Sequence, residues 1–509
     1  MADLMTHLAF QPDEGTGPLE LDCDVVVVGS GAGGAAAAHA LAVEGQSVVV
    51  VEAGAWRDAE QLPADFYGAL RDVYDGWQSG LTAGPALWPV VQARTVGGTT
   101  VLNSAICVRT PESVVAGWAR EQGLEASVLS RHLDRHQDAV EGLLGVEDTV
   151  GATLGENDRR AIRGALADGV VDPPMRRFVK DCAGEGRCMM GCRAGHKQSV
   201  DRGLLPEVLD RGGVVLSCAP VDRIAFEGRR AVGVVGRFRH PRTRTAGRSF
   251  RISARKAVFV AASATWTPLL LRRSGVRHKA LGRGFRSHPG AAVLGVYDDP
   301  IDMHRGATQG WASLGWKDQG FKLETLSLPL QLLAARLPGG GAALTRRLGE
   351  SRHLGHFARG LNAEASGRVF AGLGGRPMVR YALTRHDLER LRVGIHLLAR
   401  LHVEAGARSV LPGIAGFPSE LAADEIDQLL TAPLKPRRFT CILSHLFGGA
   451  VVGGDPATSV CDPKGRVRGH EGLVVACASG IPTTLGVNPQ LTIMALARLR
   501  AEQLLGGGP

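Results

Sequence analysis

Long apolar runs and a secretion signal are both missing from the sequence. No stretch of the 509 residues is apolar over the length that a membrane-spanning helix requires. Residues 1–21 carry acidic side chains and lack the basic start and apolar run of a signal peptide. We therefore expect a cytoplasmic protein, with peripheral contact between a basic surface and an anionic membrane as an open alternative.

Aromatic residues and lysine clusters are also scarce. Aromatic residues make up 5% of the chain, and the net charge of +9 comes mainly from scattered arginines. Without a lysine-rich run or a basic patch interleaved with aromatics, nucleic-acid binding is not expected. Nine cysteines in a chain of this length, without a signal peptide, favour a reducing compartment over a disulfide framework.

The sequence does contain material for a large buried interior. Hydrophobic residues at 44% and charged residues at 21% are typical of a soluble globular protein. A chain of 509 residues exceeds one ordinary core, so we expect two domains or one elaborated pair.

A βαβ unit around a glycine-rich turn is the clearest local pattern. The apolar run at 24–28 predicts a buried parallel strand. It leads into a G-x-G-x-x-G at 29–34 and an alanine-rich stretch at 35–43 that predicts a helix. A second apolar strand at 47–51 stops at Glu52. This order is typical of dinucleotide-binding sites.

Each position has a physical role in such a site. Gly29 permits the tight turn, Gly31 lets the backbone approach a pyrophosphate, and Gly34 lets helix and strand pack closely. The helix N-terminus presents free N–H groups and a positive dipole end to the phosphates. Glu52 is placed to accept hydrogen bonds from the adenosine ribose. The motif alone does not distinguish FAD from NAD.

Further motifs follow in a fixed order along the chain. They are R-T-V-G-G-T-T-V-L-N at 94–103, A-A-S-A-T-W-T-P-L-L-L-R-R-S-G at 261–275, L-G-R-G-F-R-S-H-P at 281–289, Ser444-His445, Gly448-Gly449, Asp455-Pro456, G-R-V at 465–467, G-V-N-P at 486–489 and a helical pattern at 491–504. Together these blocks resemble the glucose–methanol–choline (GMC) flavin oxidoreductases. Lys197-Gln198-Ser199 and the cysteines before it are most similar to the bacterial branch with long-chain alcohol oxidases and FAD-dependent dehydrogenases.

The resemblance implies an α/β fold with a Rossmann-like FAD-binding domain and a discontinuous substrate domain. The substrate domain would be a mainly antiparallel sheet covered by helices. The implied limits are 20–110, 176–290 and 440–509 for the FAD-binding domain, 111–175 and 291–439 for the substrate (cap) domain, and 1–19 for an N-terminal tail. Local patterns add a hairpin around Glu227-Gly228, a strand at 379–383 and a helix at 388–405.

The resemblance also implies bound FAD. The residues implied to contact it are Gly29, Gly31, Ala32, Gly34, Glu52, Ala53, Gly97, Gly98, Thr99, Asn103, Val221, Ala262, Cys477, Ala478, Asn488, Pro489 and Leu491. Two positions depart from the family pattern. Cys477 replaces an aspartate near the ribityl and phosphate part of the flavin, and Gly449 replaces a threonine or serine. Flavin affinity or potential is therefore expected to differ.

The catalytic pair implied by the resemblance is His445 and Asn488. An alcohol releases hydride to flavin N5 once a base has removed its hydroxyl proton, and histidine titrates near neutral pH. We therefore expect His445 to be the general base and Asn488 to orient the hydroxyl. The expected activity is FAD-dependent oxidation of an alcohol, with oxygen, a quinone or a redox protein as electron acceptor. A lyase, a fatty-acid photodecarboxylase, a natural-product tailoring oxidase and a non-enzymatic flavin scaffold are the alternatives.

Three cysteines cluster before Lys197. Cys182, Cys188 and Cys192 could hold an iron–sulfur cluster, as a similar spacing does in some bacterial members of the family. The alternatives are a compact loop of packed thiols, or a zinc site completed by His196.

One apolar segment bears on the substrate. Residues 326–337 predict a buried helix, with an apolar tunnel wall or a membrane-facing surface as alternatives. A bulky or long apolar alcohol is the expected substrate.

Overall fold

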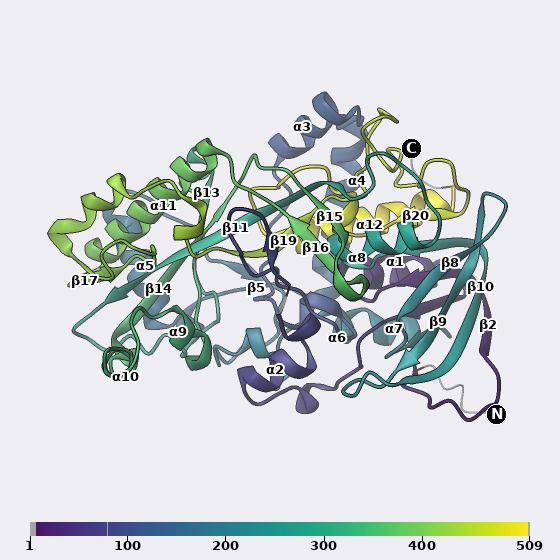
Figure 1. Cartoon of the computed structure of the whole chain (residues 1–509), viewed down its shortest axis with the longest axis horizontal. Helices are drawn as coiled ribbons and strands as arrows, with labels where there is room; N and C mark the ends of the chain where they lie inside the picture. Colours follow the sequence, from purple (N-terminus) through teal and green to yellow (C-terminus); the bar gives the residue numbers. More distant parts are fainter. Residues whose placement is uncertain (1–6, 79, 507–509) are drawn as a thin grey trace.

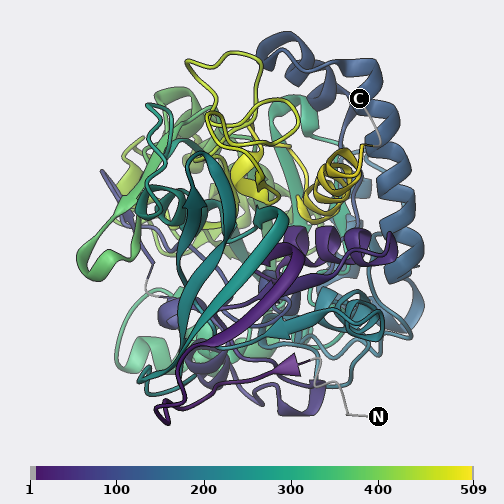
Figure 2. The ribbon, with the colours of Figure 1, turned by 90° about the vertical axis from the view of Figure 1, so that its right-hand side faces the viewer.

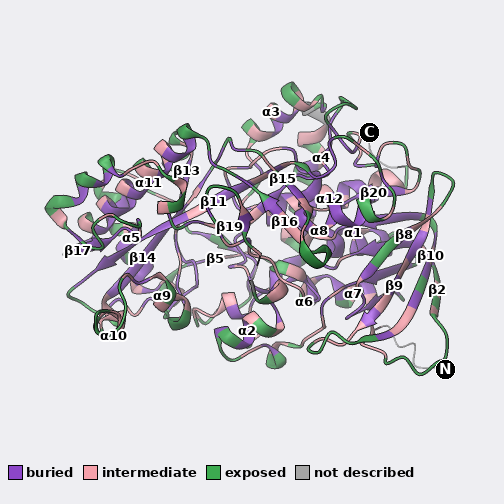
Figure 3. Cartoon of the chain, in the orientation of Figure 1, coloured by how far each residue is buried: buried purple, intermediate pink, exposed green. Residues whose placement is uncertain are grey.

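Two sheets lie side by side along the long axis of the computed structural model, which describes residues 7–78 and 80–506 (Figure 1). One is mostly parallel and the other mostly antiparallel, so the predicted α/β class with an antiparallel substrate sheet is confirmed. In Figure 3 the strands near the centre are buried, whereas the outer turns of the peripheral helices are exposed. None of the described helices is long and apolar enough to cross a bilayer.

The first sheet contains the predicted βαβ unit. In spatial order its described strands are β1 (His7–Leu8), β7 (Val214–Leu216), β3 (Val48–Val51), β2 (Leu19–Val28), β10 (Ala246–Val260), β9 (Arg230–Arg239) and β8 (Val221–Glu227), with β20 (Leu473–Val475) on the C-terminal half of β10. β9 and β8 form the predicted hairpin.

Valines explain why β2 and β3 lie in the centre. Val25 and Val27 face one core with the alanines of α1 (Ala32–Val43), while Val26 and Val28 face a second core. A strand buried on both faces needs apolar residues at every position, which these strands have. The small side chains of α1 let it pack against α12 (Gln490–Leu504), so two helices from opposite parts of the sequence lie side by side.

The second sheet is organised around one long strand, β11 (Arg283–Val296), which pairs with four others. The described order is β12 (Ala312–Ser313), β13 (Phe321–Thr325), β14 (Leu354–Leu361), β11, β15 (Gly367–Ala371), β16 (Pro377–Arg380) and β4 (Thr82–Ala83); β17 (Ser409–Leu411) and β19 (Ile442–Phe447) also pair with β11, and β18 (Leu421–Ala422) with β17. A separate pair joins β5 (Glu147–Asp148) and β6 (Arg176–Arg177).

Helices cover both sheets. α5 (Glu156–Ala167) and α11 (Arg385–Glu404) pack on the second sheet. The remaining described helices are α2 (Phe66–Asp72), α3 (Glu112–Gln122), α4 (Ala126–Leu144), α6 (Val200–Gly203), α7 (Leu205–Asp210), α8 (Ser263–Arg273), α9 (Leu330–Arg336) and α10 (Ala342–Gly349). α11 begins earlier than predicted because Thr384 and Asp387 form a reciprocal capping box at its start.

Helices α3 and α4 do not join the second sheet. Figure 2 shows them beside α12, and Val115 and Leu133 bury their side chains against Ala495. The predicted limits placed this segment in the substrate domain. Because its apolar contacts go to α12, we infer a domain boundary after α4 instead of before α3.

Three local predictions need correction. His7 and Leu8 of the predicted tail pair with β7, so they belong to the first sheet; residues 1–6 lie outside the described part. The strand predicted at 379–383 ends at Arg380 as β16. The helix predicted at 326–337 is only α9, because Leu326 and Leu328 precede it in extended chain.

Candidate functional site

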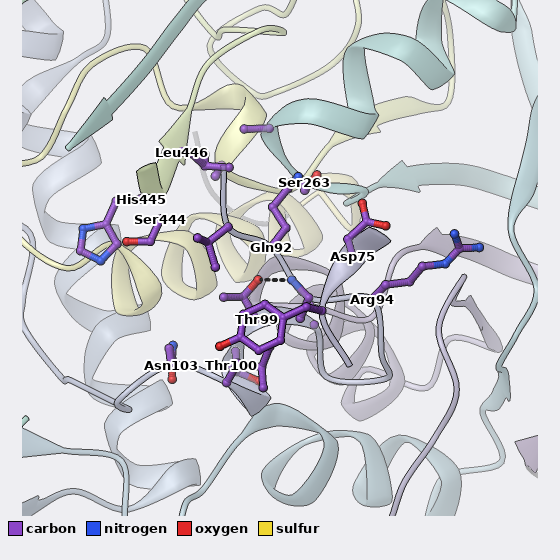
Figure 4. A pocket seen from close by; sticks show the side chains of 18 of the residues that line it. Asp75, Gln92, Arg94, Thr99, Thr100, Asn103, Ser263, Ser444, His445 and Leu446 are labelled. Carbon is purple, nitrogen blue, oxygen red and sulfur yellow. Dashed lines mark hydrogen bonds between the residues drawn. The ribbon is translucent and has the colours of Figure 1, made fainter. Parts of the chain in front are cut away.

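Residues of both sheets line one cavity of about 1070 Å³. Ligand pockets usually measure roughly 300–1,000 Å³, so this one has room for a large cofactor together with a substrate. In the close view of Figure 4, His445 and Ser444 lie at one side and Asp75 and Arg94 at the other. The two ends of the cavity therefore carry different chemistry.

The glycine turn after β2 forms the first end. Gly29 has φ +97°, and a Cβ there would lie 2.5 Å from the carbonyl oxygen of Ala261, so only glycine fits. Glu52 accepts from the backbone N–H and hydroxyl of Ser30 and from the N–H of Gly54, at 2.7–2.9 Å. Glu52 thus fixes the turn while also lining the cavity.

This end suits an anionic diphosphate. The N-terminus of α1 has no acidic residue in its first turn, so its N–H groups and dipole are not neutralised there. Gly31 approaches Gly98 so closely that a Cβ on Gly98 would lie 2.7 Å from the Gly31 Cα. Arg94 and Arg244 add positive charge to the same cavity, and sequence reasoning gave neither of them a role there. The N–H donors at the start of α1 and the absence of side chains on Gly31 and Gly98 fit the pyrophosphate of a dinucleotide.

Most residues implied to contact FAD do line the cavity. They are Gly29, Gly31, Ala32, Glu52, Ala53, Gly98, Thr99, Asn103, Val221, Ala262, Cys477, Ala478, Asn488 and Pro489.

Three others lie outside the cavity wall. Gly34 packs on the strand, since its Cβ would meet the Gly29 oxygen at 1.8 Å, and the N–H of Gly97 donates to the Ser30 hydroxyl. Leu491 is buried in the core shared by α1 and α12, so its side chain is not available to a cofactor in the cavity.

The second end contains a fixed chain of hydrogen bonds. The backbone N–H groups of Leu485 and Gly486 donate to Nε2 of His288, at 3.1 and 3.0 Å. That nitrogen must therefore be unprotonated, and neutral His288 carries its proton on Nδ1. His288 Nδ1 lies 3.1 Å from His445 Nδ1, so it donates and His445 accepts. Neutral His445 then carries its own proton on Nε2.

Burial keeps both rings neutral. It lowers the pKa of His288 well below its ordinary value, with His445 and Lys322 adding to the effect. Burial also lowers the pKa of His445 to about 4, because it outweighs the opposing influence of Glu324, and Lys322 adds to the lowering. Near neutral pH, His445 is thus a hydrogen-bond donor through Nε2.

A buried ion pair stands behind Asn488. The Lys322 ammonium donates to Asn488 Oδ1 and, at 2.8 Å, to Glu324 Oε2. With Oδ1 engaged, the Asn488 amide is left with its N–H groups for the cavity, which Asn488 and Glu324 line. Burial would raise the pKa of Glu324, but Lys322, His445 and Gln309 together outweigh this and the pKa falls below its usual value.

The cysteine cluster contacts an arginine, whereas the sequence suggested an iron–sulfur cluster there. The Arg177 guanidinium donates to Cys182 Sγ at 3.6 Å and to Cys188 Sγ at 3.4 Å. Burial would raise the pKa of the Cys188 thiol, but Arg177 and Lys197 outweigh it and the pKa is lowered. Within 7–78 and 80–506, no group of three or more His, Cys, Asp or Glu side chains is arranged to hold a metal. The predicted iron–sulfur cluster is therefore not supported.

Metal analysis tests the cysteine cluster. We expect protein purified without oxygen to contain no stoichiometric iron, because a guanidinium already faces two of the three sulfurs. Cys188→Ser should leave the visible absorbance unchanged. Stoichiometric iron that disappears in Cys188→Ser would restore the cluster.

Family comparisons match both parts of the chain. The GMC oxidoreductase N-terminal model matches residues 25–290, and the C-terminal model matches residues 374–497. The chain belongs to the GMC oxidoreductase family. It is accordingly an FAD-binding oxidoreductase, as the sequence motifs implied.

Individual relatives agree with this assignment. An uncharacterized GMC-type oxidoreductase of Mycobacterium tuberculosis is 34% identical over 91% of this chain and 72% of its own. A long-chain-alcohol oxidase of Arabidopsis thaliana is 26% identical over 94% of this chain and 66% of its own. The solved pyridoxine 4-oxidase of Mesorbium loti superposes with a TM-score of 0.74 at 18% identity, covering 96% of this chain and all of that one.

The sequence predicted no role for several residues of this GMC oxidoreductase site. His288 lies in a motif that the sequence displayed, but its bond to His445 joins positions 157 apart. Lys322 and Glu324 alternate with apolar residues in β13, a pattern that usually marks a solvent-facing strand. No sequence signal distinguished them from surface charges.

Proposed function

We propose that this GMC oxidoreductase oxidises an apolar alcohol to a carbonyl compound. The observation that carries the proposal is the convergence of two N–H donors, His445 Nε2 and Asn488 Nδ2, on the same end of the cavity as the Glu324 carboxylate. Bound FAD, held by the glycine turn and the 97–103 segment, would accept the hydrogen and two electrons removed from the alcohol carbon. The long-chain-alcohol oxidase among the relatives supports this class of substrate.

The side chains divide the work on the hydroxyl group. His445 and Asn488 donate to the substrate oxygen and favour the negative charge that builds there as the proton leaves. Glu324, ionised because Lys322 lowers its pKa, accepts the hydroxyl proton. This differs from the sequence interpretation, in which His445 was the base, because a neutral His445 already carries its proton on Nε2.

Anaerobic flavin reduction tests the activity. Purified holoenzyme is mixed without oxygen with a panel of long-chain and cyclic alcohols. We expect the visible absorbance of the oxidised flavin to decrease after mixing. If no alcohol bleaches the flavin, and illumination with a fatty acid releases carbon dioxide instead, alcohol oxidation is the wrong assignment.

Lys322→Met tests how Asn488 is positioned. We expect kcat/KM for an alcohol to fall about 10–100-fold, because the Asn488 amide loses the charged donor that orients it. Glu324 also loses its counter-charge, so its pKa rises and the rate should fall as the pH drops through the raised value. Lys317→Met, at an exposed lysine of the neighbouring turn, is the control. A pH profile identical to that of the wild type would contradict the positioning role.

A further inference from the structure

The floor of the substrate end is a trough of small residues. His288, Gly290 and Ala292 alternate along β11 and so share one face of the sheet. Gly290 pairs with Gly360, and Ala292 with Ala358, on the neighbouring strand β14. These small residues line the cavity, so the space above them stays open between β11 and β14.

One wall of the trough is apolar and ends in a charge. Leu328, Leu332 and Arg336 line the cavity at intervals of four residues, and the last two lie on one face of α9. Leu326 continues the same apolar wall. The wall therefore leads away from the hydrogen-bonded histidines toward the guanidinium of Arg336.

Arg336 has no counter-charge. Its Nη2 donates to the Ala292 carbonyl oxygen at 2.9 Å, while its Nε is enclosed without a partner. Among residues 7–78 and 80–506, no carboxylate influences the charge of its guanidinium. Burial lowers its pKa, yet an arginine stays charged at neutral pH. A buried cation of this kind is costly unless an anion pairs with it.

The adjacent side chain does not supply that anion. His356 faces the same cavity, and its Nδ1 pairs with the Leu326 carbonyl oxygen at 3.0 Å. Burial holds the pKa of His356 well below its ordinary value, so the ring is neutral. No anionic side chain of the described residues pairs with the Arg336 guanidinium, and a ligand can supply that charge.

The spacing between the two ends follows from the strand. Ala292, which holds Arg336, lies four residues beyond His288 on β11, or roughly 13 Å at the usual strand rise. We propose that Arg336 binds a carboxylate at the far end of the substrate, so that the substrate is an apolar hydroxy acid. This inference rests on the proposed alcohol oxidation and adds a carboxylate as the second functional group of the substrate. The planar guanidinium with its parallel N–H donors matches the geometry of a carboxylate.

Matched substrates test the site. For the wild-type holoenzyme, 10-hydroxydecanoate should have a higher kcat/KM than its methyl ester, which has the same alcohol without the charge. Arg336→Gln should lower kcat/KM for the acid about 10–100-fold and leave that for the ester unchanged. Arg336→Lys should recover part of the loss. Arg346→Gln, at an exposed arginine of α10, is the control.

Binding of an unreactive acid separates this proposal from the proposed oxidation. Decanoate titrated into holoenzyme should bind about 10–100-fold more weakly to Arg336→Gln, with melting temperatures confirming that both proteins are folded. If decanoate binding depends on Arg336 but no alcohol reduces the flavin, the carboxylate site stands and the oxidation fails. Equal decanoate binding by wild type and Arg336→Gln, or equal turnover of acid and ester by the wild type, would overturn the carboxylate site.

Discussion

Replacing His445 with alanine is expected to lower the rate constant of flavin reduction by an alcohol about 1,000-fold. The ring is held by His288 with Nε2 toward the cavity, so alanine removes a donor to the substrate oxygen that the fold has already oriented. Stopped-flow absorbance under anaerobic conditions measures the rate constant directly. His304→Ala removes an imidazole from the surface and should leave the rate unchanged.

The pH dependence distinguishes a donor from a base at this position. Because the pKa of His445 is lowered to about 4, the ring stays neutral from about pH 5.5 upward and the rate should not rise with its titration. A base with the ordinary histidine pKa would make the rate climb between roughly pH 5.5 and 7.5. Such a climb in the wild type, absent from His445→Ala, would return the role of base to His445.

Replacing Gly31 with valine is expected to abolish FAD binding. Gly31 has φ −67°, which any residue can adopt, so the substitution introduces no backbone strain. A Cβ there meets only the Gly98 Cα at 3.8 Å, but the two further methyl groups of valine would fill the passage between the residues. We expect the dissociation constant of FAD to rise at least about 100-fold, and the purified variant to be colourless.

Gly31→Ala is the matched control for this passage. Its single methyl group meets protein atoms only at 3.8 Å, so the variant should retain more FAD per chain than Gly31→Val. Circular dichroism of both variants, compared with the flavin absorbance per chain, separates loss of the cofactor from loss of the fold. A Gly31→Val protein that is folded and saturated with FAD would show that FAD does not bind between Gly31 and Gly98.

The structural features that are predicted well from the sequence are those determined by residues close together in the chain. The valine runs before and after the glycine turn dictate buried strands. Within that βαβ unit, Gly29 has a positive φ in the turn and Gly34 packs against the Gly29 carbonyl oxygen. The helix predicted at 491–504 is likewise present, as α12. No local pattern explains why His445 and Asn488 line the cavity, and only the family motifs indicated these two residues.

The parts that sequence misses depend on contacts between distant segments. Lys322 reaches Asn488 across 166 positions, and from sequence alone it is one more charge in a strand. The proton position on His445 depends on two backbone N–H groups that bind a different histidine. The packing of α3 and α4 on α12 is likewise set by contacts between distant segments, and it is the reason we infer a later domain boundary than the sequence predicted.

The pairing of α1 with α12 has a consequence for biosynthesis. The cavity is lined by Val28 at the end of β2 and by Ile493 of α12, so α12 supplies part of a site that starts at β2. A nascent chain on the ribosome has made the glycine turn long before α12 leaves the exit tunnel. The complete cofactor site can therefore form only after α12 has left the exit tunnel, and a truncated product lacking α12 would leave the alanine face of α1 open to chaperones and proteases.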